Sequence, residues 1–201
     1  MTGLDPERDE LCEIAVVVTD FELEVLDPGL QLVIRPSDAA LEHMGDFVRG
    51  MHQTSGLLDE IPDGMSVEAA ELEVLAYVQR FVPAERTAPL GGNTIGTDRM
   101  FLARQMPTLD GFLHYRSIDV SSIKELSRRW FPRAYFQAPT KAGGHRALAD
   151  ILDSIRELRY YRRAVFTDAP GRESAALQSI AAEVSDGFEA GLAASDDATT
   201  A

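Results

Sequence analysis

The sequence predicts a mixed α/β domain, and three observations support this. Residues 11–19 are rich in β-branched side chains, which is typical of a buried strand, and apolar and polar residues alternate through 22–34. Helical periodicity dominates from residue 66 onward. Hydrophobic residues make up 45% of the 201 residues, which is enough to form a core. Strands followed by helices indicate one β-rich layer covered by helices.

The strand signals are short and are separated by turn residues. Residues 22–34 are expected to form strand, turn and strand around Asp27-Pro28-Gly29. Residues 89–93, Pro-Leu-Gly-Gly-Asn, are expected to be the end of a strand that turns into a loop. No internal repeat is present in the sequence.

Helices are expected at five places in the first 166 residues. A helix beginning at Ser37 or Asp38 is interrupted by Gly45, Gly50 and Gly56. The others are 66–81, 98–106, 121–130 and 146–166. Ser66 and Ser121 are the expected caps, and Pro107 and Pro132 the expected stops. The expected buried sides are Ala69, Leu72, Leu75, Ala76 and Val78 in the second helix, and Leu148, Ile151, Leu152, Ile155, Leu158 and Tyr161 in the last.

We expect one folded domain over 1–167 and an acidic, flexible tail over 168–201, with a loose helix at 173–192. Net charge is −14, which argues against a protein that grips long nucleic acid. Residues 99–163 nevertheless carry a net charge of +7, which suits a local site for a few phosphates. Taken alone, this segment is better explained as an arginine-rich solvated helix face.

The single cysteine, Cys12, excludes a disulfide within the chain. No apolar run approaches the roughly 20 residues of a membrane helix, and no signal peptide is apparent. We therefore expect a cytoplasmic protein that has no membrane partner.

Two motifs place acids at helix starts. Asn93-Thr94-Ile95-Gly96-Thr97-Asp98 delivers Asp98 to one helix, and Gly143-Gly144-His145 precedes a helix that contains Asp150. Positions five apart on a helix point about 140° apart, so His145 and Asp150 converge only if His145 lies outside the helix. A histidine there is suited to take a proton from water. The simpler reading is that each acid favours a helix N-terminus for electrostatic reasons.

A third motif joins Tyr115 and Arg116 to Asp119-Val120-Ser121. A tyrosine, an arginine and a serine ahead of a helix N-terminus can contact one phosphate. Helix capping by Ser121 and core packing by Tyr115 explain the same residues without a ligand.

Five segments of the sequence, by their residues and by their order, resemble the oligoribonuclease family over roughly residues 1–166. They are Met1-Thr2-Gly3-Leu4-Asp5-Pro6, Gly92 to Arg99, His114-Tyr115-Arg116, Asp119 to Leu126, and His145-x-Ala147-x-x-Asp150. The resemblance implies α/β architecture with an RNase H-like exonuclease fold, a mixed central sheet flanked by helices. It also implies 3′→5′ hydrolysis of short RNA, especially dinucleotides, to mononucleotides.

The resemblance assigns roles residue by residue. Asp98 and Asp150 match two of four metal-binding acids that hold two divalent ions, Mg²⁺ or Mn²⁺, and His145 matches the general base. Leu4 matches an apolar wedge against the bases and Phe47 a stacking aromatic. The remaining substrate-binding matches are His52, Thr94, Arg116 and Ser121, of which the last two cap the 5′ phosphate. Tyr115 matches a tyrosine that reaches the active site across a homodimer interface. The partner is then single-stranded RNA of two to five nucleotides.

The resemblance also predicts a missing strand. In the family, an apolar strand ending in Asp-x-Glu leads into Met-Thr-Gly-Leu, and here Met1 is residue 1. We expect a misassigned start, because Leu4, Asp98, His145 and Asp150 are all retained. The alternatives are an inactive remnant that binds short RNA or nucleotides, and a DNA-directed proofreading-type exonuclease. As it stands, the chain is expected to lack two metal-binding acids and to be inactive or weakly active.

Overall fold

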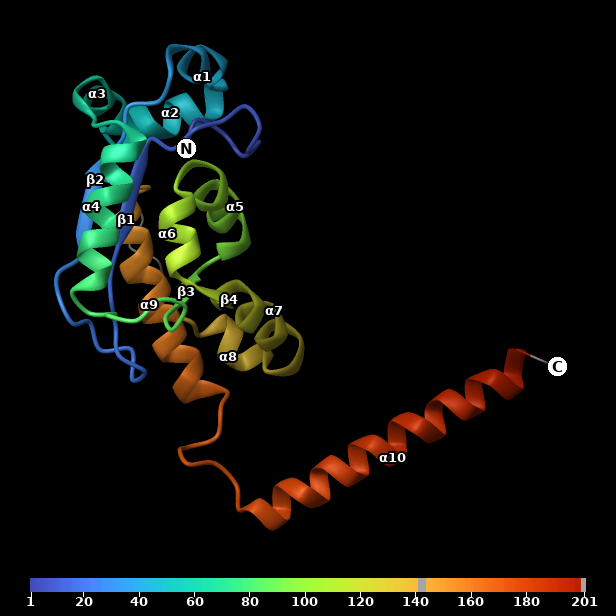
Figure 1. The fold of residues 1–201 in the computed structure, drawn as a ribbon. Helices are drawn as coiled ribbons and strands as arrows, with labels where there is room; N and C mark the ends of the chain where they lie inside the picture. The colour runs from blue at the N-terminus through green and yellow to red at the C-terminus, as the bar shows by residue number, and fades with distance from the viewer. Residues whose placement is uncertain (141–143, 200–201) are drawn as a thin grey trace. The chain divides into compact units, whose positions relative to one another are not determined.

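The computed structural model describes residues 1–140 and 144–199. The chain divides into two compact units, Met1–Val165 and Phe166–Ala201. Among the described residues, the first unit contains four strands, nine α-helices and one 3-10 helix, and Figure 1 shows how they are arranged. The last helix, α10 (Ser174–Thr199), belongs to the second unit.

The strands form two pairs of opposite type. Strand β1 (Glu13–Val16) is antiparallel to β2 (Leu30–Val33), and β3 (Pro89–Gly92) is parallel to β4 (His114–Asp119). The predicted α/β architecture with mixed strand pairing and flanking helices is confirmed.

A strand expected from residue 22 does not form. Thr19 and Val25 share only an isolated antiparallel bridge. Asp20 explains this, because its carboxylate accepts hydrogen bonds from the backbone of Glu22 at 2.9 Å and Glu24 at 2.8 Å. These bonds curl the backbone into a tight turn instead of an extended strand.

An apolar slot separates the two pairs of strands. Among the described residues, neither β1 nor β2 is hydrogen-bonded to β3 or β4. The slot has a volume of about 570 Å³. Val16 and Val18 line it from the β1 side and Leu90 from β3, while Ile151 and Ile155 of the last helix of this unit close it. Two open strand edges therefore face one apolar space.

The first helices follow the predicted glycine breaks. They are α1 (Asp38–His43), α2 (Asp46–Thr54), α3 (Leu57–Glu60) and the short 3-10 helix η1 (Ile61–Asp63). Ser37 caps α1 as expected, by accepting a hydrogen bond from Ala40. Gly45 and Gly56 lie at the breaks, and Gly56 has a φ of +77°, whereas Gly50 lies inside α2.

Helix α4 (Val67–Gln79) is capped by Ser66 as expected, but of its predicted buried side only Val78 is buried and Leu75 partly buried. Leu72 is 66% exposed, and the buried residues are Ala70, Val74, Tyr77 and Val78. The helix carries apolar residues on more than one side, so the pattern does not define its rotation. The Tyr77 hydroxyl donates to Asp27 at 3.0 Å, which helps to fix that rotation.

Two prolines begin helices as well as ending the preceding ones. Helix α5 (Ile95–Gln105) starts three residues earlier than expected and is followed by α6 (Pro107–Phe112). Helix α7 (Val120–Trp130) is followed in the same way by α8 (Pro132–Phe136). Proline is tolerated in the first turn, where its missing N–H has no intrahelical acceptor.

Helix α9 (Ala147–Ala164) packs against β1, β2 and β3. Tyr161 is buried as predicted, but Leu152 is 43% exposed. Polar residues take the inward positions instead: Asp153, Ser154 and Glu157 are all buried. The reason is a polar network beneath this helix, described below.

The main core lies between α4, α5, α6 and the β1–β2 pair. Its buried members include Ile34, Val74, Phe101, Met106 and Phe112. In Figure 1, α4 lies along the β1–β2 pair, with α5 and α6 beside it. This core fixes α5, the helix that carries Asp98.

Helix α10 has an exposed apolar row of Leu177, Ile180, Val184 and Phe188. The tail residues 200–201, for which disorder was expected, lie outside the described residues. No described helix combines the length and apolar character needed to span a membrane.

Candidate active site

The turn between β3 and α5 is held in an unusual conformation. Thr94 has a φ of +54°, which is rare for a β-branched residue. Its backbone N–H donates to Asp119 Oδ1 at 3.0 Å and to Ser121 Oγ at 2.9 Å. These bonds stabilise the strained turn and set the direction of α5, whose first turn carries Asp98.

Ser121 does not cap α7, contrary to the prediction. The cap is Asp119, whose carboxylate accepts from the Ser121 backbone at 3.0 Å. The Ser121 hydroxyl is engaged elsewhere, because it donates to Asn93 Oδ1 at 3.0 Å. Ser121 therefore lies between α7 and the β3–α5 turn.

Asn93 connects this turn to α9. Its Nδ2 donates to Ser154 Oγ at 2.9 Å and to Glu157 Oε2 at 3.1 Å. Glu157 also pairs with Lys124 of α7 at 3.1 Å. The buried Glu157 carboxylate is thus satisfied by a charge from one side and an amide from the other.

Asp150 lies in the first turn of α9, and the start of this helix is tied to β1. Glu13 Oε1 accepts from Arg146 Nε, and Glu13 Oε2 accepts from the Ala147 backbone, each at 2.8 Å. The Glu13 side chain is only 5% exposed. Arg146 also forms a bidentate pair with Glu60, which lowers the pKa of the Glu60 carboxyl. The helix N-terminus is therefore fixed by a buried carboxylate.

His145 lies just outside α9, as its proposed role requires, and it is exposed. It has a φ of +51° and follows Gly144, whose φ is +131°. Gly143, the other half of the predicted glycine hinge, lies outside the described residues. The imidazole is thus presented to solvent beside the first turn of α9.

The N-terminus lies between α2 and α5, as Figure 1 shows. Burial raises the pKa of the Asp98 carboxyl, and the Met1 ammonium acts in the opposite direction. The Met1 carbonyl oxygen lies 2.9 Å from His52 Nε2. Burial lowers the pKa of His52, which is 3% exposed. Met1, His52 and Asp98 therefore share one electrostatic environment.

Two predicted substrate contacts are exposed apolar side chains. Leu4 is 75% exposed on the loop after Met1, and Phe47 is 85% exposed in the first turn of α2. His52, on the same helix as Phe47, is buried and faces the Met1 carbonyl instead of solvent.

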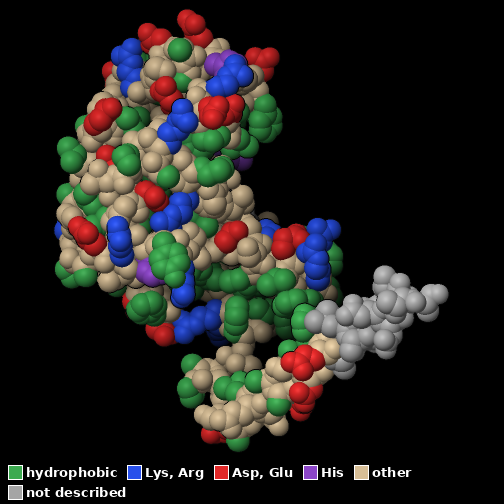
Figure 2. All heavy atoms as spheres, turned by 45° about the vertical axis from the view of Figure 1, so that its right-hand side comes forward, with side chains coloured by type: hydrophobic (Ala, Val, Ile, Leu, Met, Phe, Trp, Pro, Cys, Tyr) green, Lys and Arg blue, Asp and Glu red, His purple; other side chains and the backbone are tan. Residues whose placement is uncertain are grey.

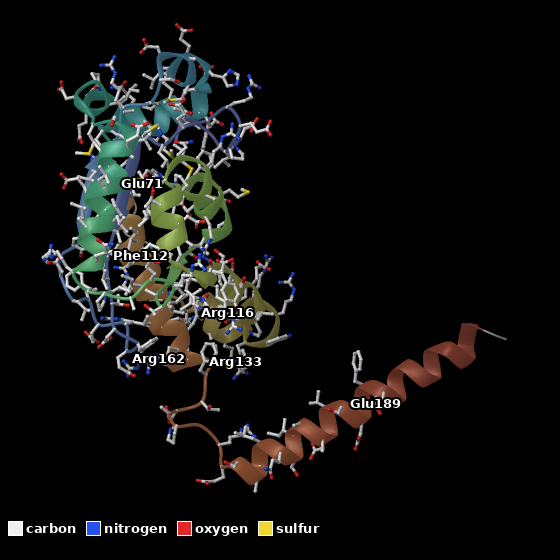
Figure 3. The ribbon with its side chains drawn as sticks, in the orientation of Figure 1. Glu71, Phe112, Arg116, Arg133, Arg162 and Glu189 are labelled. Carbon is white, nitrogen blue, oxygen red and sulfur yellow. The ribbon has the colours of Figure 1, made fainter. Side chains whose placement is uncertain are left out.

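Tyr115 and Arg116 lie on the exposed part of β4. The Tyr115 ring stacks on His114, with 4.6 Å between ring centroids, and the Arg116 guanidinium lies 5.4 Å from the Tyr115 ring. Arg116 is labelled in Figure 3. Tyr115 is 73% exposed and not part of the core, so the core-packing explanation of this residue is wrong.

A metal ion would need more ligands than these residues bring together. Among residues 1–140 and 144–199, no three His, Cys, Asp or Glu side chains are grouped closely enough to hold an ion. Asp98 and Asp150 are carboxylates of the type that hard divalent cations prefer. The donor set on the described residues is nevertheless incomplete for two ions.

Comparison with known proteins decides the family. The family model described as "Exonuclease" matches residues 1–158. An oligoribonuclease of Leifsonia xyli is 66% identical over 92% of this chain and 89% of its own length. Oligoribonucleases of Streptomyces griseus and Mycobacterium tuberculosis are 59% and 54% identical, covering 92% and 93% of this chain and 92% and 87% of their own lengths.

This chain belongs to the oligoribonuclease family of exonucleases. The family resemblance of the sequence motifs is confirmed, and with it the assignment to hydrolytic nucleases. Exonucleases of this kind generally use divalent metal ions.

The motifs suggested no role for several residues that hold this family's candidate site together, although two of these residues, Asn93 and Asp119, lie within the motifs. Glu13, Asn93, Asp119 and Ser154 each bond to a segment that carries a predicted site residue. One signal was present in the sequence: Glu13 is an acid within an otherwise apolar run. A buried charge of that kind requires a partner, which proves to be the start of α9.

Proposed function

We propose that this chain is a 3′→5′ exoribonuclease that degrades RNA of two to five nucleotides, preferentially dinucleotides, to mononucleotides in the cytoplasm. The observation that carries the proposal is the hydrogen-bonded link between its two candidate metal-binding turns. Asn93, five residues before Asp98, bonds to Ser154, and Ser154 Oγ donates to the Asp150 carbonyl oxygen at 2.8 Å. Because this chain belongs to the oligoribonuclease family, we interpret the two linked segments as parts of one metal-binding site.

His145 is the proposed general base. It is exposed and lies outside the helix, and histidine is the side chain that most often transfers protons in catalysis. Asp98 and Asp150 would hold divalent metal, Mg²⁺ or Mn²⁺, with two ions per site as the family resemblance suggests. Bound ions of this kind polarise the scissile phosphate and stabilise charge on the leaving oxygen. Because the donor set of the described residues is incomplete, further carboxylates are needed.

The slot between β1 and β3 suggests where the additional metal-binding carboxylates come from. An extended apolar strand placed there would pair with both open edges and cover Val16, Leu90 and Ile155. The Met1 carbonyl oxygen lies 2.9 Å from His52 Nε2, so a strand leading into Met1 would end beside His52. We propose that such a strand, ending in Asp-x-Glu, completes the site.

Substrate binding is proposed to use both exposed and buried groups. Leu4 and Phe47 contact the bases, which favours single-stranded RNA because only unpaired bases expose their faces. His52 and Thr94 complete the proposed set of substrate-binding residues. Arg116 and Ser121 cap the 5′ phosphate, and this cap limits the substrate length.

The exposed aromatic surface of β4, α7 and α8 supports a homodimer. Tyr115, Trp130 and Phe136 are 73%, 64% and 75% exposed. Figure 2 shows hydrophobic and basic side chains next to one another on the larger unit. Aromatic residues and arginine are enriched in protein interfaces. We propose that a second copy covers it and that Tyr115 reaches the partner's active site.

The test is hydrolysis of labelled RNA in Mn²⁺ by the chain supplied with an apolar strand that ends in Asp-x-Glu. We expect a diribonucleotide to be cleaved faster than a long single strand, and His145→Ala to abolish turnover. Equal rates on the dinucleotide and a long DNA strand would instead favour a proofreading-type exonuclease. Tight binding without turnover would favour a binding module, which the absence of a three-ligand cluster from the described residues also supports.

A further inference from the structure

The loop that presents Leu4 is closed by a buried carboxylate. Asp9 is 8% exposed, and its Oδ1 accepts from the Thr2 hydroxyl at 2.9 Å. Its Oδ2 accepts from the Asp5 backbone at 2.9 Å. The two bonds lie on either side of Leu4 in the sequence, so one carboxylate fixes the backbone both before and after the exposed leucine.

Gly3 fits against this carboxylate. A Cβ atom on Gly3 would lie 2.2 Å from Asp9 Oδ2 and 2.6 Å from its Cγ. Such a contact is far shorter than van der Waals distance, so only glycine allows the turn to close on Asp9. The turn is thus built around Asp9.

The loop is also anchored to the helix of Asp98. Gln105, the last residue of α5, donates from Nε2 to the Asp9 carbonyl oxygen and accepts at Oε1 from the Leu11 backbone, each at 3.0 Å. The Thr2 backbone donates to the Glu10 carbonyl at 2.8 Å. An exposed leucine on a mobile loop would lose conformational freedom on binding a base, whereas this loop has already lost it.

We propose that Asp9 is a positioning residue for substrate, acting through Leu4. This proposal rests on the proposed function, in which Leu4 contacts a base. Asp9 fixes the Thr2–Asp5 backbone, and the fixed backbone holds the Leu4 side chain in its outward, base-contacting direction. The ligand class is a short RNA with an unpaired base.

The test is a double-mutant cycle on the full chain, measured as the equilibrium affinity for a fluorescent diribonucleotide. Asp9→Asn keeps the size of the side chain but removes its charge and one acceptor oxygen, so the two charge-assisted bonds from Thr2 and Asp5 are weakened. We expect affinity to fall about fivefold in the presence of Leu4 and to change less than twofold in the Leu4→Ala background. The matched control is Glu7→Gln, which removes one exposed negative charge from the same loop and should leave affinity unchanged.

A second measurement does not depend on substrate. Amide hydrogen exchange at Thr2 and Asp5 should accelerate about tenfold or more in Asp9→Asn but not in Glu7→Gln. Unchanged exchange, or an equal loss of affinity in both backgrounds, would overturn the role of Asp9. Faster exchange in a chain that binds no diribonucleotide would uphold the ordering of the loop by Asp9 but overturn its role in substrate binding, together with the proposed function.

Discussion

Asn93 Nδ2 lies 2.9 Å from Ser154 Oγ, and this bond joins the β3–α5 turn to α9. Ser154 in turn donates to the carbonyl of Asp150. The two segments that carry the candidate metal-binding acids are therefore connected by two consecutive hydrogen bonds. Residues 61 positions apart in the sequence thereby define the relative positions of those segments.

Asn93→Ala should weaken this connection. The change removes the bonds to Ser154 and Glu157 and leaves the Ser121 hydroxyl without its acceptor. We expect the free energy of unfolding in urea to fall by about 2 kcal/mol. Ser154→Ala should cost less, about 1 kcal/mol, because Asn93 keeps its bond to Glu157. A larger loss for Ser154→Ala than for Asn93→Ala would contradict the assignment of Asn93 as the centre of the network.

Glu13→Gln should destabilise the start of α9. The amide removes the charge that pairs with Arg146 and accepts from Ala147. Because Glu13 is 5% exposed, we expect a loss of about 2–3 kcal/mol in urea unfolding. Glu60→Gln changes the other partner of the same arginine, but at an exposed position, and should cost less than about 1 kcal/mol. Equal losses would show that burial of Glu13 is not the reason for its effect.

Asp98→Asn should stabilise the metal-free chain at neutral pH. Burial raises the pKa of Asp98, so ionisation of this carboxyl opposes folding. The penalty is fully present above the raised pKa and disappears below the ordinary value of 3.8. The gain in unfolding free energy should therefore be seen at pH 7 and vanish near pH 3. A gain that is independent of pH would contradict burial of the charge as its cause.

The same carboxyl should make Mn²⁺ binding pH-dependent. Divalent ions bind the deprotonated form, so affinity should fall as pH drops through the raised pKa of Asp98. Calorimetric titration with Mn²⁺ at several pH values measures this. Asp98→Asn should bind the ion more weakly than the unchanged chain at neutral pH.

Trp130→Glu should convert a dimer to a monomer. Trp130 is 64% exposed within the aromatic surface proposed to pair two copies. A charge there would be buried without a partner in the dimer. Sedimentation velocity should show a mass near 22.0 kDa for this variant. The control is Leu72→Glu on α4, which is 66% exposed but lies outside the surface, and should leave the dimer intact. A dimer in both variants would place the interface elsewhere.

Local signals in the sequence predicted much of the fold. Serine caps and glycine breaks are decided within a few residues, so Ser66 was assigned correctly as a cap, and Ser37 was one of the two caps considered for α1. The rotation of α4 was not predictable, because it depends on Asp27, 50 positions from Tyr77. The inward polar face of α9 was not predictable either, because it depends on distant partners. Ser154 and Glu157 are buried because Asn93 bonds to both and Lys124 pairs with Glu157.

In the candidate site too, local motifs were predictable from the sequence, whereas contacts between distant residues were not. The motif wording indicated Asp98, Asp150 and His145, and it placed His145 outside the helix as the structure does. The residues that support them could not be found from spacing. Asp119 replaced Ser121 as the cap of α7 because the Ser121 hydroxyl bonds to Asn93, a contact across 28 positions. The proposed roles of the site residues remain predictions.

The proposed active site is tested most directly by adding the proposed Asp-x-Glu strand as a separate peptide. A synthetic peptide of six apolar β-branched residues followed by Asp-x-Glu would be added to the full chain with Mn²⁺ and a labelled diribonucleotide. We predict release of mononucleotides that requires the peptide. The release should be lost with Asn-x-Gln in place of Asp-x-Glu, and lost again in His145→Ala. If the acidic and amide peptides give the same rate, or if His145→Ala leaves turnover unchanged, the proposed active site is wrong.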